Sequence, residues 1–412
     1  MSDVSKTADV TIVGAGQAGS EVATSLRQQG FTGSIVLLGD EPYLPYRRPP
    51  LSKTYLAGEA SQESLYIKAA SAYEKHGIQC RTGIAVEKID RESRRLFLSD
   101  GTTLTYGTLV LATGGRPRKL TITGAEHDNV YYVRTLDDIE RLKRDFRSDA
   151  RLVVIGGGYI GLEAAAVAVK HGLRVSVVEA APRVLARVAA PELSSFYERV
   201  HREHGVELLT GRGVSELLGQ DRVDAVLLDD GKELPADLVV VGVGLIPNVE
   251  LAAIAGLEVD NGIVVDAETR TSDPSIYAAG DCTSHHNDFY GKWHRLESVP
   301  NAIEQGRIVA SNITGKPARY SAVPWFWSDQ YDLKLQMVGL SAGYDQIVVR
   351  GSFDSNSFIA FYVKDGVVIS ADAVNRPHDF MIAKQLVADR VHAPDTSLAD
   401  ETQPLKALLG AS

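Results

Sequence analysis

The chain has 412 residues, which is long for one hydrophobic core and predicts two or three domains. Its formal net charge of −10 disfavours nucleic acid as the main partner, because phosphate binding needs basic surface. Hydrophobic residues make up 44% and charged residues 23%, as in soluble globular proteins, and no apolar run reaches the length of a membrane span. With two cysteines and no apolar signal core at the N-terminus, we expect a cytoplasmic protein that binds neither membrane nor nucleic acid.

The first predicted elements form a dinucleotide-binding unit. A β-branched run at 10–13 is typical of a buried parallel strand and leads directly into Gly14, Gly16 and Gly19. An amphipathic helix follows, and a second strand at 35–38 ends at Gly39-Asp40-Glu41. The glycines let backbone amides approach a pyrophosphate at the helix N-terminus, and the acid binds a ribose.

The next segment, YLPYRRPPLSK at 43–53, combines three prolines with two arginines and a lysine. Proline fixes φ and pushes the preceding residue into an extended conformation, so we expect a rigid cationic loop. Arg48 is a candidate phosphate ligand, whereas Arg47 is expected to be a surface charge. A strand beginning near 106 closes on Ala112-Thr113-Gly114, a turn of the kind that covers a bound adenine dinucleotide.

A second unit repeats the plan of the first. RLVVIGGGYIGLEAAAVAVKHG contains Gly156, Gly158 and Gly161, and the following strand RVSVVE ends at Glu179. Two such units in one chain predict two bound nucleotides. A carboxylate at Glu179 accepts two ribose hydroxyls and repels the extra phosphate of NADP, so NADH is favoured, although Arg183 nearby argues for NADP.

Later motifs favour a flavin as one of the two nucleotides. GLIPN occupies 244–248, and SIYAAGDC at 275–282 reads as a strand ending in Gly280-Asp281. A carboxylate there can accept hydrogen bonds from polyol hydroxyls, which flavin has and NAD lacks.

The last part of the chain reads as short antiparallel strands. A hairpin turn is predicted at DGV (365–367) and a helix near 378–390. In PWFWSDQY, alternation places Trp325 and Trp327 on one face and Phe326 on the other. Tryptophan in such a segment often marks an interface, and the alternative is that both indoles belong to a core.

These motifs, in this order, resemble the two-dinucleotide flavoprotein reductases of glutathione-reductase-like fold. PPLSK, GGGYIGLE, AAGDC, ESVPNAIEQG and PWFWSDQY resemble the ferredoxin reductases of bacterial oxygenase systems in particular. The resemblance implies an α/β fold with two Rossmann-like domains, binding FAD and NADH, and a C-terminal α+β domain with an antiparallel sheet. The implied FAD domain spans 1–116 and 249–322, the NAD domain 117–248 and the C-terminal domain 323–412.

The resemblance also implies roles for individual residues. Lys53 is expected beside the reactive edge of the flavin, paired with Glu163 in the first turn of the second dinucleotide helix, and Trp327 between flavin and partner; these three are the implied catalytic residues. The implied FAD-binding residues are Gly14, Gly16, Ala18, Gly19, Asp40, Arg48, Lys53, Val86, Ala112, Thr113, Gly114, Arg134, Asp281, Val299 and Trp327. The implied NAD-binding residues are Gly156, Gly158, Ile160, Gly161, Glu163, Glu179 and Gly244, and no metal ligands are expected.

The positions of the cysteines bear on the chemistry. Disulfide reductases of this fold place a redox pair after the first dinucleotide unit, and peroxide-reducing members place one cysteine there, but residues 41–65 contain none. Cys80 and Cys282 read as inert. Because thiolates carry out such reactions, we expect electrons to leave the flavin directly and one at a time.

The expected function is therefore NADH-dependent reduction of a [2Fe–2S] ferredoxin that serves a cytochrome P450 monooxygenase. Arg307, with Lys334 or Arg295, is a candidate basic patch for an acidic ferredoxin, and the alternative is scattered surface arginines.

Two other functions stay open. The reductase component of an aromatic-ring dioxygenase and a rubredoxin reductase would share every motif above. A signalling or nucleic-acid-binding flavoprotein, like the apoptosis-inducing-factor group, would need a large basic face, which the acidic composition disfavours. The sequence carries no signal for an oligomeric state.

Overall fold

The computed structural model describes residues 6–410, which fall into two compact units. The first unit contains the chain up to Arg47, Gln62–Arg116 and Ile246–Pro324. The second contains Arg48–Ser61, Pro117–Leu245 and the chain from Trp325 onward. The unit boundary therefore falls inside the proline-rich loop: residues 43–47 belong to the first unit, and residues 48–53, with Lys53, belong to the second. The division into three domains stays a prediction.

The first unit is built on a sheet with the strand order β3-β2-β1-β6-β5-β4, with β18 paired to the other edge of β6. Strands β1, β2, β3, β6 and β18 are parallel, and β4 and β5 are antiparallel additions. Val13, Leu111 and Ala278, the last residues of β1, β6 and β18, lie in register. The loops that follow these strands therefore emerge at one edge of the sheet. The bounds are β1 (Lys6–Val13), β2 (Ile35–Leu38), β3 (Ile78–Arg81), β4 (Val86–Asp90), β5 (Arg95–Leu98), β6 (Thr103–Leu111) and β18 (Ile276–Ala278).

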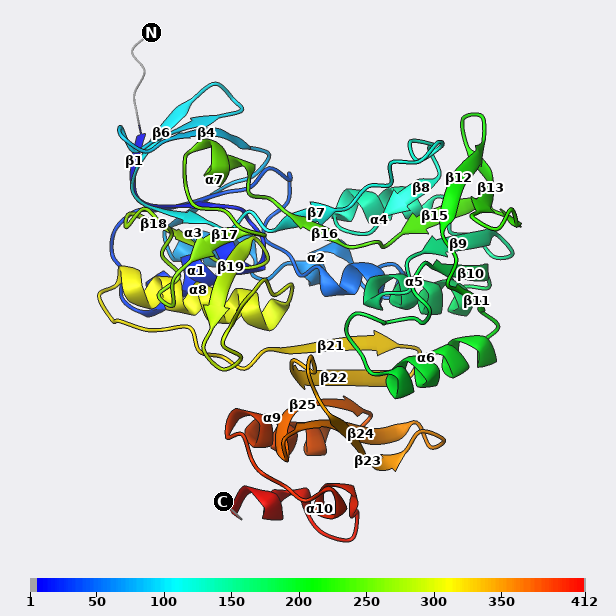
Figure 1. Cartoon of the computed structure of the whole chain (residues 1–412). Helices are drawn as coiled ribbons and strands as arrows, with labels where there is room; N and C mark the ends of the chain where they lie inside the picture. The colour runs from blue at the N-terminus through cyan, green and yellow to red at the C-terminus, as the bar shows by residue number, and fades with distance from the viewer. Residues whose placement is uncertain (1–5, 411–412) are drawn as a thin grey trace. The chain divides into compact units, whose positions relative to one another are not determined.

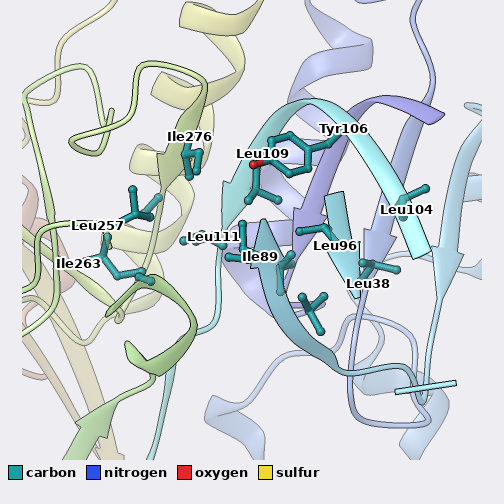
Figure 2. Packing of buried hydrophobic residues seen from close by; sticks show 14 of the residues in the cluster. Leu38, Ile89, Leu96, Leu104, Tyr106, Leu109, Leu111, Leu257, Ile263 and Ile276 are labelled. Carbon is teal, nitrogen blue, oxygen red and sulfur yellow. The ribbon is translucent and has the colours of Figure 1, made fainter. Parts of the chain in front are cut away.

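Apolar residues cover both faces of this sheet. On one face, α1 (Gln17–Gln28) packs against α8 (Val299–Ile313), and Val22, Ala23 and Leu26 are fully buried, as the amphipathic pattern predicts. On the other face, the side chains of β4, β5, β6 and β18 form the cluster in Figure 2, with Leu96 and Leu109 fully buried. Each such leucine stabilises the fold by roughly 1.5–3 kcal/mol relative to exposure.

Smaller elements complete the first unit. They are α2 (Gln62–Leu65), α3 (Ala70–Lys75), α7 (Glu250–Ile254), β17 (Ile263–Val265), β19 (Thr283–Asn287) and β20 (Lys292–His294). Strands β7 (Gly115–Pro117) and β16 (Leu245–Pro247) pair with each other where the chain passes between the units.

The second unit holds a parallel sheet of order β11-β10-β9-β15-β8. Its strands are β8 (Val130–Tyr132), β9 (Arg151–Ile155), β10 (Arg174–Glu179), β11 (Glu207–Thr210) and β15 (Leu238–Val241). Its helices are α4 (Leu136–Lys143), α5 (Tyr159–Lys170) and α6 (Pro191–Glu203). An antiparallel sheet of β12 (Val214–Gly219), β13 (Val223–Leu228) and β14 (Glu233–Pro235) lies beside it.

The remainder of the second unit is an antiparallel sheet of order β21-β22-β25-β24-β23, with α9 packed on β22 and β25 (Figure 1). Its elements are β21 (Trp325–Gln330), β22 (Leu333–Gly339), β23 (Gln346–Ser352), β24 (Ser357–Lys364), β25 (Val367–Val374), α9 (Pro377–Ala388) and α10 (Asp395–Ala399), with 3₁₀ turns η1 (Pro49–Ser52) and η2 (Leu405–Gly410). The predicted hairpin turn is confirmed, because Asp365 and Gly366 both have positive φ, +50° and +77°. The predicted helix after the strands is confirmed as α9. Among the described residues, no helix is both long and apolar enough to cross a bilayer.

A buried acid lies at the centre of this antiparallel sheet. Asp372 of β25 is 3% exposed, and its carboxylate accepts a hydrogen bond from the hydroxyl of Tyr362 on β24. Burial raises the pKa of Asp372 from 3.8 to about 7, because the charged form loses its hydration. The folded protein therefore binds this proton more tightly than the unfolded chain, which favours folding at low pH. That contribution is lost as the pH rises through 7.

We predict that Asp372→Asn becomes more stable relative to the natural protein as the pH rises. Asparagine keeps an oxygen that accepts from Tyr362 but carries no charge. Between pH 4.5 and 7 the difference in unfolding free energy should shift in favour of the variant by about 1.4 kcal/mol per pH unit. Thermal or urea unfolding of both proteins across this range measures the shift, and a difference independent of pH would contradict it.

Candidate functional site

The first glycine-rich loop joins β1 to α1 at the sheet edge where β6 and β18 also end. Gly14 has a φ of +113°, and a Cβ there would lie 2.1 Å from the carbonyl oxygen of Ala112. A Cβ on Gly19 would lie 2.0 Å from the oxygen of Gly14. Around Gly16, in contrast, a Cβ would meet nothing within 4 Å. The protein itself thus requires the first and third glycines, whereas the second faces open space at the start of a helix without a side-chain cap.

Two further turns reach the same edge. Thr113 donates its hydroxyl to the carbonyl of Asn248 at 2.6 Å, which fixes the turn after β6. Gly280, after β18, packs against Ala18 of α1, and its N–H donates to Oε1 of Gln305 on α8 at 2.7 Å. The structure therefore brings the first loop, the 112–114 turn and the turn that carries Asp281 to one edge of the first unit.

Three other predicted FAD-binding residues also belong to the first unit. Asp40 follows β2 and is exposed, and its carboxylate accepts the N–H of Glu41. Val86 begins β4 with its side chain in the hydrophobic cluster, which leaves only its backbone for a ligand. Val299 is the first residue of α8 and therefore lies at the N-terminus of that helix.

The second glycine-rich loop repeats the arrangement of the first. Gly156 has a φ of +107° and approaches the carbonyl of Gly242, and a Cβ on Gly161 would lie 2.2 Å from the oxygen of Gly156. A Cβ on Gly158 would again meet nothing within 4 Å, and Gly158 begins α5 without a side-chain cap. Ile160 in the first turn of α5 is 47% exposed, and the space beside Gly244 is open. Apolar surface next to free helix amides is the setting that a dinucleotide requires.

The acid at the end of β10 braces the second loop. Glu179 accepts the N–H of Gly157 through Oε2 and the N–H of Ala181 through Oε1, each at 2.7 Å. Each carboxylate oxygen keeps a lone pair for a ribose hydroxyl. Arg183 donates instead to the carbonyls of Ala186 and Ala189 and to the hydroxyl of Ser194. Its guanidinium thus ties its own loop together, which weakens the argument for a phosphate of NADP.

The two glycine-rich loops fit the dinucleotides that the sequence implies. In each loop, a Cβ on the first or third glycine would collide with protein atoms, whereas a Cβ on the second would meet none. This open position adjoins a helix N-terminus that has no side-chain cap, so its first amides are left unpaired. Because a pyrophosphate needs backbone approach and free N–H donors, both loops have the residues to bind one.

A second cluster, in the second unit, is centred on Glu163. Its carboxylate is 3% exposed, and Oε2 lies 2.6 Å from Nζ of Lys53, whose side chain is 16% exposed. Ser52 donates to Oε2 and Ser328 donates to Oε1, both at 2.6 Å. The predicted pairing of Lys53 with Glu163 is confirmed, but its predicted place in the first turn of the helix is wrong. Because Gly158 is the N-cap, Glu163 is the fifth helical residue, and Lys53 rather than the helix terminus neutralises it.

The hydroxyls of Ser52 and Ser328 are site residues that the sequence reasoning missed. Ser52 stands beside the predicted Lys53 in the η1 turn, and Ser328 is one residue after the predicted Trp327. Alternation along β21 did contain a signal, because it places Ser328 on the face opposite both tryptophans.

The segment 48–61 is anchored to the rest of the second unit at several points. Tyr55 donates its hydroxyl to Glu140 at 2.8 Å, and Nζ of Lys143 lies 3.6 Å from the centre of the Tyr55 ring. Arg48 donates to the carbonyl of Arg134 at 2.6 Å. These contacts hold Lys53 in place and confirm that the proline-rich loop is fixed.

Strand β21 presents two different faces. Trp325 and Trp327 lie on one face with ring centroids 5.7 Å apart, as predicted, and Trp325 also contacts Phe380 of α9 and lies under Nζ of Lys384. On the other face, Phe326 contacts Tyr159 of α5 at 5.2 Å. Trp325 is thus held by packing on α9.

The predicted basic patch is largely neutralised. Arg307 pairs with Glu21 at 2.9 Å, and Arg295 pairs with Glu297. Each of these arginines is therefore paired with a carboxylate. This arrangement favours the alternative of scattered surface arginines over a basic patch.

Both cysteines of the chain are free, and neither favours a thiolate. Cys282 is fully buried in the hydrophobic cluster, and burial raises the pKa of its thiol. Burial also raises the pKa of Cys80, on β3, to about 11. Because the thiolate is the reactive form, both observations agree with the expectation that these cysteines are inert.

Comparison with known proteins gives matches along nearly the whole chain. A family model described as pyridine nucleotide-disulphide oxidoreductase matches residues 8–306, and one described as reductase C-terminal matches 325–409. The chain is 51% identical to putidaredoxin reductase of Pseudomonas putida, covering 98% of this chain and 97% of that protein. It is 48% identical to a ferredoxin–NAD(P)⁺ reductase of a Sphingomonas species, covering 97% of each. Among solved structures, the covalent putidaredoxin reductase–putidaredoxin complex matches with a TM-score of 0.95 at 50% identity, over 98% of each chain.

We predict that alanine has different effects at two glycines of the first loop: at Gly19 it lowers the protein's stability, and at Gly16 it weakens FAD binding. Gly19→Ala should destabilise the protein with or without ligand, because its Cβ would overlap the carbonyl of Gly14. Gly16→Ala should leave the apoprotein's stability nearly unchanged but weaken FAD binding about tenfold or more, because its Cβ would occupy the open space. Thermal unfolding of the apoproteins and FAD titration separate the two, and equal loss of stability in both variants would contradict the assignment.

Proposed function

The chain belongs to the pyridine nucleotide-disulphide oxidoreductase family, and we propose that it is an NADH-dependent ferredoxin reductase with FAD as its bound cofactor. FAD binds the first glycine-rich loop and NADH the second. The observation that supports this most strongly is the coexistence of two dinucleotide loops with the pairing of Lys53 to the buried Glu163 and with cysteines that do not favour a thiolate. The disulphide chemistry in the family's name needs a thiolate pair, which the half-buried Cys80 and the buried Cys282 do not supply.

Bound FAD supplies hydride acceptance and the release of electrons one at a time. The protein's own residues bind and orient the two nucleotides and stabilise charge. Lys53 would provide the cation that stabilises negative charge on a bound flavin, and Glu163 fixes the position of that ammonium group. Glu179 binds the adenosine ribose of NADH and makes the site unfavourable for the 2′-phosphate of NADPH, because two like charges would face each other.

We propose that the electron acceptor is a [2Fe–2S] ferredoxin that serves a cytochrome P450 monooxygenase. The similarity to putidaredoxin reductase, and to its complex with putidaredoxin, supports this acceptor. Trp327 lies on the aromatic face of β21 beside Trp325 and is the residue we assign to the exit of electrons. The ferredoxin docks on the surface that Trp327 forms, and the attraction there is local because the chain as a whole is acidic. The free cysteines suit work in a reducing cytoplasm.

A turnover panel tests this function. The purified protein should be yellow, NADH should bleach it without added thiol, and NADH oxidation should accelerate with small [2Fe–2S] proteins above the rate with oxygen alone. Absence of FAD, or no acceleration by any [2Fe–2S] protein, would overturn the proposal. Acceleration by rubredoxin alone, in the same panel, would reassign the acceptor.

We predict that Trp327→Ala slows ferredoxin reduction about tenfold while reduction of a small soluble dye changes less than twofold. The reason is that a dye needs no docked indole, whereas a protein acceptor meets the surface that Trp327 forms. Trp325→Ala is the matched control, because this indole is engaged with Phe380 and Lys384, and it should affect stability more than the ratio of the two rates. Equal slowing of both acceptors by Trp327→Ala would mean that the indole serves packing only.

A further inference from the structure

A hydrogen-bonded chain extends from Glu163 into the interior of the second unit. Ser328 on β21 donates to Oε1 of Glu163 at 2.6 Å and accepts from Nε2 of Gln330 at 3.3 Å. Oε1 of Gln330 lies 2.9 Å from Nε2 of His201 on α6, and Nδ1 of His201 lies 3.0 Å from the hydroxyl of Tyr331. Ser328, Gln330 and His201 are buried, with exposed fractions of 1% or less.

The order of donors along this chain is fixed by the groups that compose it. The amide oxygen of Gln330 can only accept, so Nε2 of His201 carries the proton, and Nδ1 accepts from Tyr331. Burial lowers the pKa of His201 to about 4, so the ring stays neutral at physiological pH and this order is kept. Every hydrogen bond therefore points from Tyr331 towards Glu163, and aligned bonds of this kind strengthen one another.

The chain ends on a carboxylate that needs this support. A buried charge is costly unless it is paired and its remaining lone pairs are satisfied. Lys53 and Ser52 satisfy Oε2, and on the other oxygen the hydrogen bond from Ser328 fixes the orientation of the carboxyl plane. A rotation of that plane would move Oε2 and, with it, the ammonium group of Lys53.

We propose that Ser328, supported by Gln330 and His201, is a positioning residue that holds Glu163 in the orientation that places Lys53. This inference rests on the proposed function of Lys53 in flavin reduction. Ser328 acts on the reaction only through Glu163.

The test is stopped-flow reduction of the FAD-loaded protein by NADH, without any ferredoxin. Ser328→Ala should lower the limiting rate constant about tenfold while the dissociation constant of NADH changes less than twofold. Ser328→Thr, which keeps the hydroxyl, should restore most of the rate. Ser370→Ala is the matched control, because Ser370 is equally buried in the same sheet but donates to the carbonyl of Val338, and it should leave the rate constant unchanged.

Two further measurements separate positioning from general damage. In a Glu163→Gln background, Ser328→Ala should lower the limiting rate constant less than twofold, because the residue through which Ser328 acts has already changed. In protein with ¹³C-labelled glutamate, the infrared carboxylate band that Glu163→Gln removes should shift in Ser328→Ala and not in Ser370→Ala. If Ser328→Ala does not fold, Gln330→Met replaces it as the variant that tests the proposal. This substitution breaks the hydrogen-bonded chain one step farther from Glu163 and should lower the limiting rate constant about threefold.

The proposal is overturned if Ser328→Ala matches Ser370→Ala in rate constant and infrared band, or if its effect is undiminished in the Glu163→Gln background. An unchanged rate constant in Gln330→Met overturns it when that variant decides. Failure of NADH to reduce the natural protein at all would instead overturn the proposed function, so the two failures are distinguishable.

Discussion

The candidate site of the second unit depends on the neutralisation of one buried carboxylate. Glu163 is almost completely removed from water, and an isolated charge there would destabilise the fold by several kcal/mol. Lys53 supplies the opposite charge, but an ammonium group alone does not fix the direction of a carboxylate. The hydroxyls of Ser52 and Ser328 do so, and they come from two segments far apart in the chain. The proline-rich loop, α5 and β21 are thus joined through one side chain.

This dependence gives a reason for the rigidity of the loop that carries Lys53. A long flexible side chain on a mobile loop would lose much conformational entropy on pairing, which commonly cancels the gain from an ion pair. Prolines restrict the backbone before pairing, and the contacts of Tyr55 with Glu140 and Lys143 restrict it further. The unusual composition of residues 43–53 is therefore explained by what the loop holds.

Much of the fold could be predicted because its signals are local. The glycine spacing, the strands before each loop and the acids after them predicted both dinucleotide units. The structure gives the first and third glycine of each loop a steric reason, whereas the second glycine faces open space. The pairing of Lys53 with Glu163, 110 positions apart, came from the resemblance to a family rather than from any local pattern. Ser328, Gln330 and His201 were missed because serine, glutamine and histidine are common in ordinary surfaces and cores. Their alignment depends on how β21 packs against α5 and α6, which the sequence of any one segment does not contain.

The two faces of β21 have a consequence for how this strand can vary. Its odd-numbered residues carry the indoles, and its even-numbered residues carry the ring that contacts α5 and the hydroxyl and amide that serve Glu163. Because side chains alternate strictly, an insertion or deletion of one residue would exchange both sets at once. Substitution can therefore adjust either face alone, whereas a change in length would disable both together, and we expect related proteins to preserve the spacing here even where they differ in side chain.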